Sequence, residues 1–434
     1  MPKRKYLETI FSNFGSYESP NGVFNQADLN NSPLIRARIS LRTGQVHGIK
    51  REAINALYGL THAIYTGTDR YRRGSTFKEI SDAVFDTLME FFDQAPAKVD
   101  ADTIATIDRK IEAWFCAKAT STYLYIPCDI NPYPAKSFTI GAIRFTFLTE
   151  FIPITEKSVP NSFVFEQMYE AMRQHGTLWM AEIEVHDCLP NRAAEIGDLA
   201  VDLALVALQL IVPLKYSERI ARLHARRVPQ LKNSVSISNG HVSADGTNQQ
   251  PGHGFDGSVL EKIISQESHV LASVGKRINA FLNGHGSLPR LNQSWNDAAY
   301  WFHEGIAEPL DTIAVPKLET AIEVLLCAVS SKGSEVRIIQ AIKTFYGLES
   351  DQTLSPDSII TVKEFAKGLV RDRSRLLHGT WSTLTTDMRS SRSSLTVLAH
   401  ELLIQFSMEL DEYEAAGTMI DDIDPFLTWI EARR

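Results

Sequence analysis

The sequence predicts an α+β protein in which a mixed α/β N-terminal region precedes an all-helical C-terminal bundle. Three observations support this fold class. Between residues 137 and 185 two segments alternate in polarity, as half-buried strands do, and the first is rich in β-branched and aromatic side chains. After residue 257 apolar residues recur at the three-to-four spacing of helices almost to the end. Between these parts, residues 229–257 are rich in Ser, Asn and Gly, which indicates a boundary.

Length and charge limit the classes of function. The 434 residues fit two or three domains, each large enough to bury a core. The net charge of −8 means that any contact with RNA needs a local basic patch on an acidic body. The longest apolar stretch is interrupted by polar residues, so we expect no membrane partner. No apolar signal-peptide core follows the basic start, and the four scattered cysteines indicate reduced thiols, so we expect a cytoplasmic protein.

Residues 1–228 are predicted to form one mixed α/β domain with a sensing or regulatory role. The first 45 residues, rich in Asn, Ser, Pro and Gly, are expected to be irregular or to form short strands. Apolar residues at helical spacing then predict helices near residues 50–60, 80–91 and 104–115. Strands are expected over 137–148 and 177–185, and a buried helix over 194–214.

Residues 229–257 allow two interpretations, a mobile linker or a hairpin excursion. Ser234-Val-Ser-Ile-Ser alternates directly before the turn pair Asn239-Gly240, as a hairpin does. The remaining residues, 258–434, are predicted to form a compact helical bundle. Six helices are expected, over residues 260–282, 294–308, 316–331, 335–346, 361–378 and 391–414.

The fifth of these helices carries the strongest candidate for chemistry. Thr361 and Glu364 have the spacing of a capping box, which predicts the helix start. The apolar stripe of this helix is expected to consist of Val362, Phe365, Ala366, Leu369, Leu376 and Leu377. On a helical wheel Arg373 falls near the middle of this stripe, where a charge must be paired, face a partner chain or take part in chemistry. His378 follows in the last turn, and Gly379 is a natural helix terminator.

The segment Arg373-Ser-Arg-Leu-Leu-His378-Gly379 resembles the Arg-x4-His signature of the HEPN domains, in particular the Apea-like branch. Two upstream segments support this resemblance. Residues 321–326, Ala-Ile-Glu-Val-Leu-Leu, resemble the early helix of the family, and residues 298–307 resemble the aromatic helix before it. The resemblance covers about residues 290–410. It implies a HEPN fold and a metal-independent endoribonuclease that uses no cofactor.

The residue types at the two signature positions suit RNA hydrolysis. The reaction needs the 2′-hydroxyl deprotonated, the phosphorane charge stabilised and the leaving oxygen protonated. Arg373 would hold the phosphate and His378 would act as general acid or base. Five residues along a helix rotate a side chain by about 140°, so the two side chains diverge within one helix. We therefore expect a homodimer in which two chains share the site, as the resemblance also implies.

The surroundings of the pair supply further candidates. Ser374 stands where many active members of the family carry Asn, Asp or His, and its hydroxyl can still donate and accept a hydrogen bond. Glu323 lies inside an apolar run and is the expected partner of Arg373. Three cations surround the motif and form either a solvated face or a grip on the RNA backbone, namely Arg371, Arg375 and Lys367.

Two functional hypotheses follow. The first is a ribonuclease effector of antiviral defence or a toxin, which cleaves RNA, with tRNA as one candidate. The N-terminal region would sense a phage-derived or other trigger. The alternative is a catalytically inactive HEPN bundle that serves as a dimerisation or adaptor module for a partner.

Overall fold

The computed structural model describes residues 2–17, 34–39, 46–92, 96, 98–151, 162–223, 231–239, 241–248, 252, 254–284, 286–328, 330–354, 359–417 and 420–434. The chain divides into two compact units. The first contains Met1–Thr122 and Val185–Ile196, and the second contains Tyr123–Glu184 and Gly197–Arg434. This division differs from the predicted limits at residues 228 and 258, because Tyr123–Glu184 and the chain from Gly197 onward belong to the same unit as the C-terminal helices.

The first unit combines a small antiparallel sheet with helices. Its strands β1 (Phe14–Tyr17), β2 (Leu34–Ile39) and β3 (Val46–Lys50) pair in the order β1-β3-β2. The three predicted helices are present as α3 (Ile54–Tyr65), α5 (Phe77–Met89) and α6 (Ala101–Lys118), and the short α4 (Asp69–Gly74) joins two of them. Their apolar faces form one core.

One element of the first unit was not expected from the sequence. Residues Pro2–Phe11 form helix α1, although the first 45 residues were predicted to be irregular or to form short strands. Leu7, Ile10 and Phe11 are buried, and α1 packs against α3. The helix is thus stabilised by tertiary packing of one apolar face, which short helices require.

The second unit contains most of a five-stranded sheet with the order β5-β6-β7-β4-β8. The predicted strand segments are the hairpin β5 (Phe138–Ile140) and β6 (Ile143–Phe147), and β7 (Trp179–Cys188). Strands β4 (Thr120–Asp129) and β8 (Ala221–Arg222) were not predicted. Helix α8 (Ser162–His175) precedes β7, and the buried helix expected over 194–214 is α9 (Pro190–Ile211), followed by α10 (Leu214–Ser217).

Of the two interpretations of residues 229–257, the hairpin is the one that the structure contains. Strands β9 (Leu231–Ser238) and β10 (His241–Asn248) pair antiparallel, with Ile237 opposite Val242. The hairpin belongs to the second unit, so these residues do not separate two compact parts of the chain.

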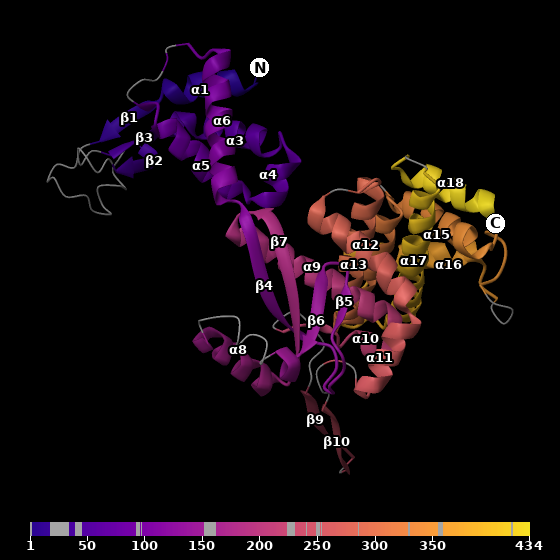
Figure 1. Ribbon diagram of the computed structural model, residues 1–434. Helices are drawn as coiled ribbons and strands as arrows, with labels where there is room; N and C mark the ends of the chain where they lie inside the picture. The colour runs from indigo at the N-terminus through magenta and orange to yellow at the C-terminus, as the bar shows by residue number, and fades with distance from the viewer. Residues whose placement is uncertain are drawn as a thin grey trace. The chain divides into compact units, whose positions relative to one another are not determined.

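The C-terminal residues form a helical bundle (Figure 1). Its helices are α11 (Gly257–Gln266), α12 (Ser268–Asn283), α13 (Pro289–Ile306), α14 (Asp311–Leu325), α15 (Ser331–Tyr346), α16 (Val362–Leu377), α17 (Arg389–Ala415) and α18 (Ile423–Arg433). The predicted helix 260–282 is wrong as a single element, because the backbone leaves helical geometry at Glu267. Helix α18 was not predicted, and Pro316 lies inside α14 instead of beginning it.

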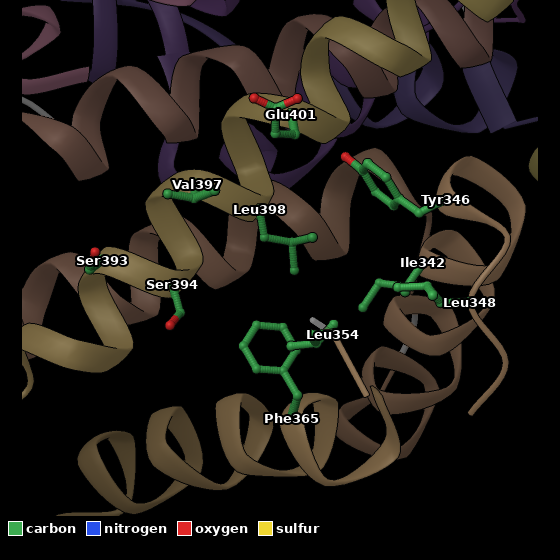
Figure 2. A pocket seen from close by; sticks show the side chains of 10 residues that line it. All are labelled: Ile342, Tyr346, Leu348, Leu354, Phe365, Ser393, Ser394, Val397, Leu398 and Glu401. Carbon is green, nitrogen blue, oxygen red and sulfur yellow. The ribbon is translucent and has the colours of Figure 1, made fainter. Parts of the chain in front are cut away.

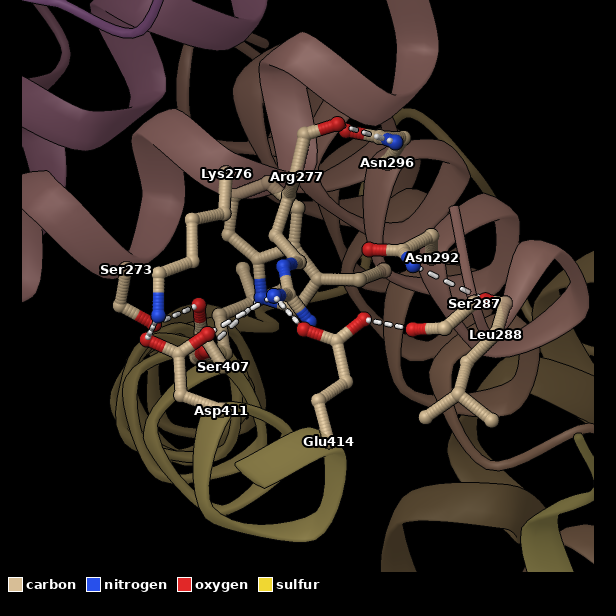
Figure 3. A network of polar contacts seen from close by, with 12 residues as sticks. Ser273, Lys276, Arg277, Ser287, Leu288, Asn292, Asn296, Ser407, Asp411 and Glu414 are labelled. Carbon is tan, nitrogen blue, oxygen red and sulfur yellow. Dashed lines mark hydrogen bonds and ion pairs between the residues drawn. The ribbon is translucent and has the colours of Figure 1, made fainter. Parts of the chain in front are cut away.

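A buried network of hydrogen bonds and ion pairs connects α12 to α17. Arg277 is 1% exposed and donates from Nη2 to Asp411 at 2.8 Å and to Glu414 at 3.0 Å (Figure 3). On the same interface the hydroxyls of Ser273 and Ser407 are 2.7 Å apart. A buried guanidinium needs such partners, so these contacts define how the two helices pair.

These observations confirm an α+β protein. In the part of the chain that the structure describes, no helix combines the length and the apolar character needed to cross a bilayer.

Candidate functional site at the end of helix α16

The local sequence fixes both ends of α16. At its start the amide of Glu364 donates to Thr361 Oγ1 at 3.2 Å, and the Glu364 carboxylate accepts from the amide of Thr361 at 3.0 Å. These hydrogen bonds form the predicted capping box and hold the pKa of Glu364 below its usual value. At the other end, Gly379 adopts a left-handed φ of 66° directly after the cap residue His378.

The buried face of α16 differs slightly from the predicted stripe. Val362, Ala366, Leu369 and Leu376 are buried as expected, but Leu377 is 61% exposed. Arg373 is half-buried, with a side-chain exposure of 21%. The apolar stripe therefore places Arg373 at the edge of the contact between helices, where a guanidinium can meet a buried acid and still reach solvent.

Arg373 is held by acidic residues of α14, which packs against α16. Its Nη1 donates to Glu323 Oε1 at 2.7 Å, so the expected contact between these two residues is present. Glu323 in turn accepts a hydrogen bond from the hydroxyl of Ser334, at the start of α15. A charge-assisted bond with a second donor on the same carboxylate orients the guanidinium more firmly than an isolated pair.

A second acid, Glu319, was not predicted as part of this site. It is fully buried one turn before Glu323 on α14, and its Oε2 lies 3.9 Å from Arg373 Nε. Among the residues that the structure describes, neither carboxylate oxygen of Glu319 has a hydrogen-bond partner. Burial raises the pKa of Glu319 to about 8, the charge of Arg373 opposes this rise, and the nearby Glu323 adds to it. Its spacing of four residues from Glu323 was the sequence signal that could have identified it.

Asp372, also not predicted, connects α16 to the first turn of α17. It is 8% exposed, and its Oδ2 accepts from Ser391 Oγ at 2.7 Å. Its Oδ1 accepts from Arg371 Nε at 3.2 Å and from Arg371 Nη2 at 3.0 Å. The guanidinium of Arg371 is therefore engaged by its neighbour in the chain, whereas Lys367 is exposed one turn earlier.

His378 is exposed at the end of the helix. Its amide donates to the carbonyl of Ser374 at 3.0 Å, while no hydrogen bond or ion pair of its imidazole occurs among the residues that the structure describes. Beside it, the Arg375 guanidinium lies over the ring of Trp381, 4.8 Å from the centroid, which orders the segment after the helix.

The chain does not bring the two signature residues together. Arg373 faces α14, and within the described ranges no hydrogen bond or ion pair joins it to His378. The end of α16 thus offers an exposed imidazole and, separately, an oriented guanidinium with anion-binding geometry. No protein-family model, no curated protein and no solved structure matches the chain.

Proposed function

We propose that the protein is an endoribonuclease of the HEPN type, with its active site at the end of α16. The observation that carries this proposal is an exposed imidazole, His378, five residues after Arg373, whose guanidinium a neighbouring helix holds in place. His378 would transfer protons to or from the ribose and leaving-group oxygens, and Arg373 would bind the phosphate.

The contacts around Arg373 assign roles to its neighbours. Glu323 would position the guanidinium rather than react, since it accepts from Arg373 and from Ser334. Ser374 would supply a hydroxyl beside the phosphate. Lys367 and Arg375 would contact the RNA backbone, while Arg371 would have to share its guanidinium between RNA and Asp372.

The separation of Arg373 and His378 makes two chains part of the proposal. Side chains that diverge by about 140° on one helix can meet when a two-fold axis places two copies of α16 side by side. The active form would then be a homodimer. RNA cleavage in the cytoplasm, with tRNA as one substrate and a phage-derived or other trigger, would make the protein a defence or toxin effector.

One observation favours a second candidate function. The ion pair between Arg373 and Glu323 gives the guanidinium a counter-ion without any RNA. If that is the whole role of Arg373, the bundle is a non-catalytic dimerisation or adaptor module, and His378 is a surface residue.

RNA cleavage by the full-length protein distinguishes these functions. Wild type, His378→Ala and His269→Ala would be incubated with cellular RNA, with and without a chelator, and expressed in cells whose RNA integrity is followed. His269 is an exposed histidine on α12 and serves as the matched control. We expect cleavage by wild type and His269→Ala, and a loss of roughly a hundredfold or more in His378→Ala. Intact RNA with wild type, or equal cleavage by His378→Ala, would refute the ribonuclease.

A mixing experiment tests the shared site. Arg373→Ala and His378→Ala chains would be combined, and cleavage compared with each variant alone. Partial recovery is expected, because a mixed dimer retains one intact arginine and one intact histidine. A strict monomer at micromolar concentration, measured by light scattering, would exclude the two-chain cleft.

A further inference from the structure

Two clefts of different chemistry lie next to each other along α17. The first, called here the apolar cleft, has a volume of about 480 Å³ and lies between α15, α16 and α17. Its walls are mainly aliphatic and aromatic, and include Ile342, Leu354, Phe365 and Leu398. Figure 2 shows Phe365 pointing from α16 toward Leu398 on α17. This volume lies in the range of small-molecule sites.

The second, called here the cationic cleft, has a volume of about 300 Å³ and lies at the start of α17. Three cations line it, Lys215 from α10 and Arg389 and Arg392 from α17, against the single carboxylate of Asp311. The N-cap residue of α17, Met388, makes no side-chain hydrogen bond to the first turn. The amide of Arg389, the first residue of α17, donates to Asp387 Oδ1 at 3.1 Å, and the dipole of the long helix adds to the positive potential at its start.

The partners of these cations leave positive charge in the cleft. Arg392 donates to Asp311 at 2.8 Å and to the carbonyl of Ile306 at 3.0 Å, which holds its guanidinium in place. Arg389 pairs with Asp387, which is exposed and is not part of the cleft wall. Lys215 lies 4.7 Å from the centroid of the Tyr216 ring, and no carboxylate pairs with it in the described part of the chain.

The two clefts are continuous. Ser393 and Val397 line both of them, one helical turn apart on α17. At a rise of about 1.5 Å per residue, the distance along α17 from Arg389 to Glu401 is about 18 Å. Glu401 lines the far end of the apolar cleft and would repel an anion there (Figure 2). The electrostatics therefore give the combined site a direction, with its positive end at the start of α17.

We infer that the combined site binds a small amphipathic anion, with an aliphatic body in the apolar cleft and a single anionic head group beside Lys215, Arg389 and Arg392. Aliphatic side chains dominate the apolar cleft, which fits a flexible chain better than a planar ring. The inference does not depend on RNA cleavage, since neither Arg373 nor His378 lines either cleft.

Calorimetric titration of the full-length protein tests this site. The probes are decyl phosphate below its micelle-forming concentration, decanol, inorganic phosphate and adenosine monophosphate. Decyl phosphate is expected to bind roughly tenfold or more tightly than each of the others, because only it fills both clefts. The double change Lys215→Gln and Arg389→Gln should weaken decyl phosphate roughly tenfold and leave decanol unchanged.

Two further variants complete the test. Val397→Trp should block the junction and weaken decyl phosphate, because Val397 lines both clefts. Lys262→Gln, at an exposed lysine of α11, is the matched control and should bind like wild type.

Equal binding of decyl phosphate and decanol would overturn the cationic half of the site. Tighter binding of adenosine monophosphate than of decyl phosphate would overturn the aliphatic half. An unchanged affinity in both cleft variants would place the probe elsewhere and overturn the inference.

Discussion

Arg373 and Glu323 join α16 to α14 through a single charge-assisted hydrogen bond of 2.7 Å, and a second acid lies fully buried one helical turn away. Because Arg373 is the proposed phosphate-binding residue, the energetics of this cluster should affect both stability and function. The contribution of this cluster to stability can also be tested without knowing any substrate.

The ion pair itself should contribute to stability. Glu323→Ala leaves the half-buried Arg373 guanidinium without its hydrogen-bonded partner and removes the acceptor of the Ser334 hydroxyl. We expect a loss of about 1–3 kcal/mol in the free energy of unfolding. Urea unfolding measures this loss, with Glu166→Ala, at an exposed glutamate of α8, as the control. Equal effects of the two changes would show that the pair contributes nothing specific.

Glu319 should make stability depend on pH. Its ordinary pKa of 4.5 applies in the unfolded chain, whereas burial raises the folded pKa to about 8. Between these values the folded state binds more protons, so stability falls as pH rises, by at most about 1.4 kcal/mol per pH unit. Below pH 4.5 Glu319 is protonated in both the folded and the unfolded state, so its contribution to stability no longer changes with pH.

Glu319→Gln removes this titration. Unfolding free energies of wild type and variant would be measured at several pH values between about 5 and about 8. Wild type should lose stability relative to Glu319→Gln as the pH rises. If the unfolding free energies of the two proteins changed with pH in parallel, the carboxyl group of Glu319 would be ionised in the folded protein, with Arg373 as its counter-ion.

Two glycines of the α16 segment should respond to alanine with opposite signs. At both Gly368 and Gly379 a Cβ atom would meet nothing within 4 Å. Gly379 has a φ of 66°, so Gly379→Ala should cost about 1 kcal/mol of backbone strain. Gly368 lies inside the helix, where Gly368→Ala should stabilise by about 0.5–1 kcal/mol. Denaturant midpoints of both variants check this, and a shift in the same direction would contradict the assignment of the helix end.

A close backbone contact should limit substitution where α12 meets the β5–β6 turn. A Cβ atom on Gly275 would lie 2.8 Å from the amide nitrogen of Gly141. Gly275→Ala therefore forces two backbones apart, and we expect a loss of about 1–3 kcal/mol. Gly254→Ala, whose Cβ atom would meet nothing within 4 Å, is the control in the same thermal unfolding measurement. Similar melting temperatures for the two variants would show that the contact adapts at little cost.

The sequence by itself determined the helices and their ends most clearly. Capping residues, helical spacing and a terminating glycine act over one or two turns, so Thr361, Glu364 and Gly379 sufficed to place α16. Alternating polarity, which is also a local signal, located the segment of β5 and β6, and together with the turn pair Asn239-Gly240 it supported the hairpin at 231–248. Helix α1 and strand β4 were missed because packing and strand pairing with distant segments stabilise them.

Only the tertiary structure decided how the candidate site is assembled. The sequence indicated that Arg373 needed a partner and suggested Glu323, but the burial of Glu319 and the contact of Asp372 with Ser391 depend on how helices pack. The same holds for the two clefts on α17, since the cationic cleft combines Lys215 with Arg389 and the apolar cleft combines side chains of α15, α16 and α17. Local residue patterns specify elements, whereas burial, pKa and cavities arise where separate elements meet, and their positions are not encoded in any single segment.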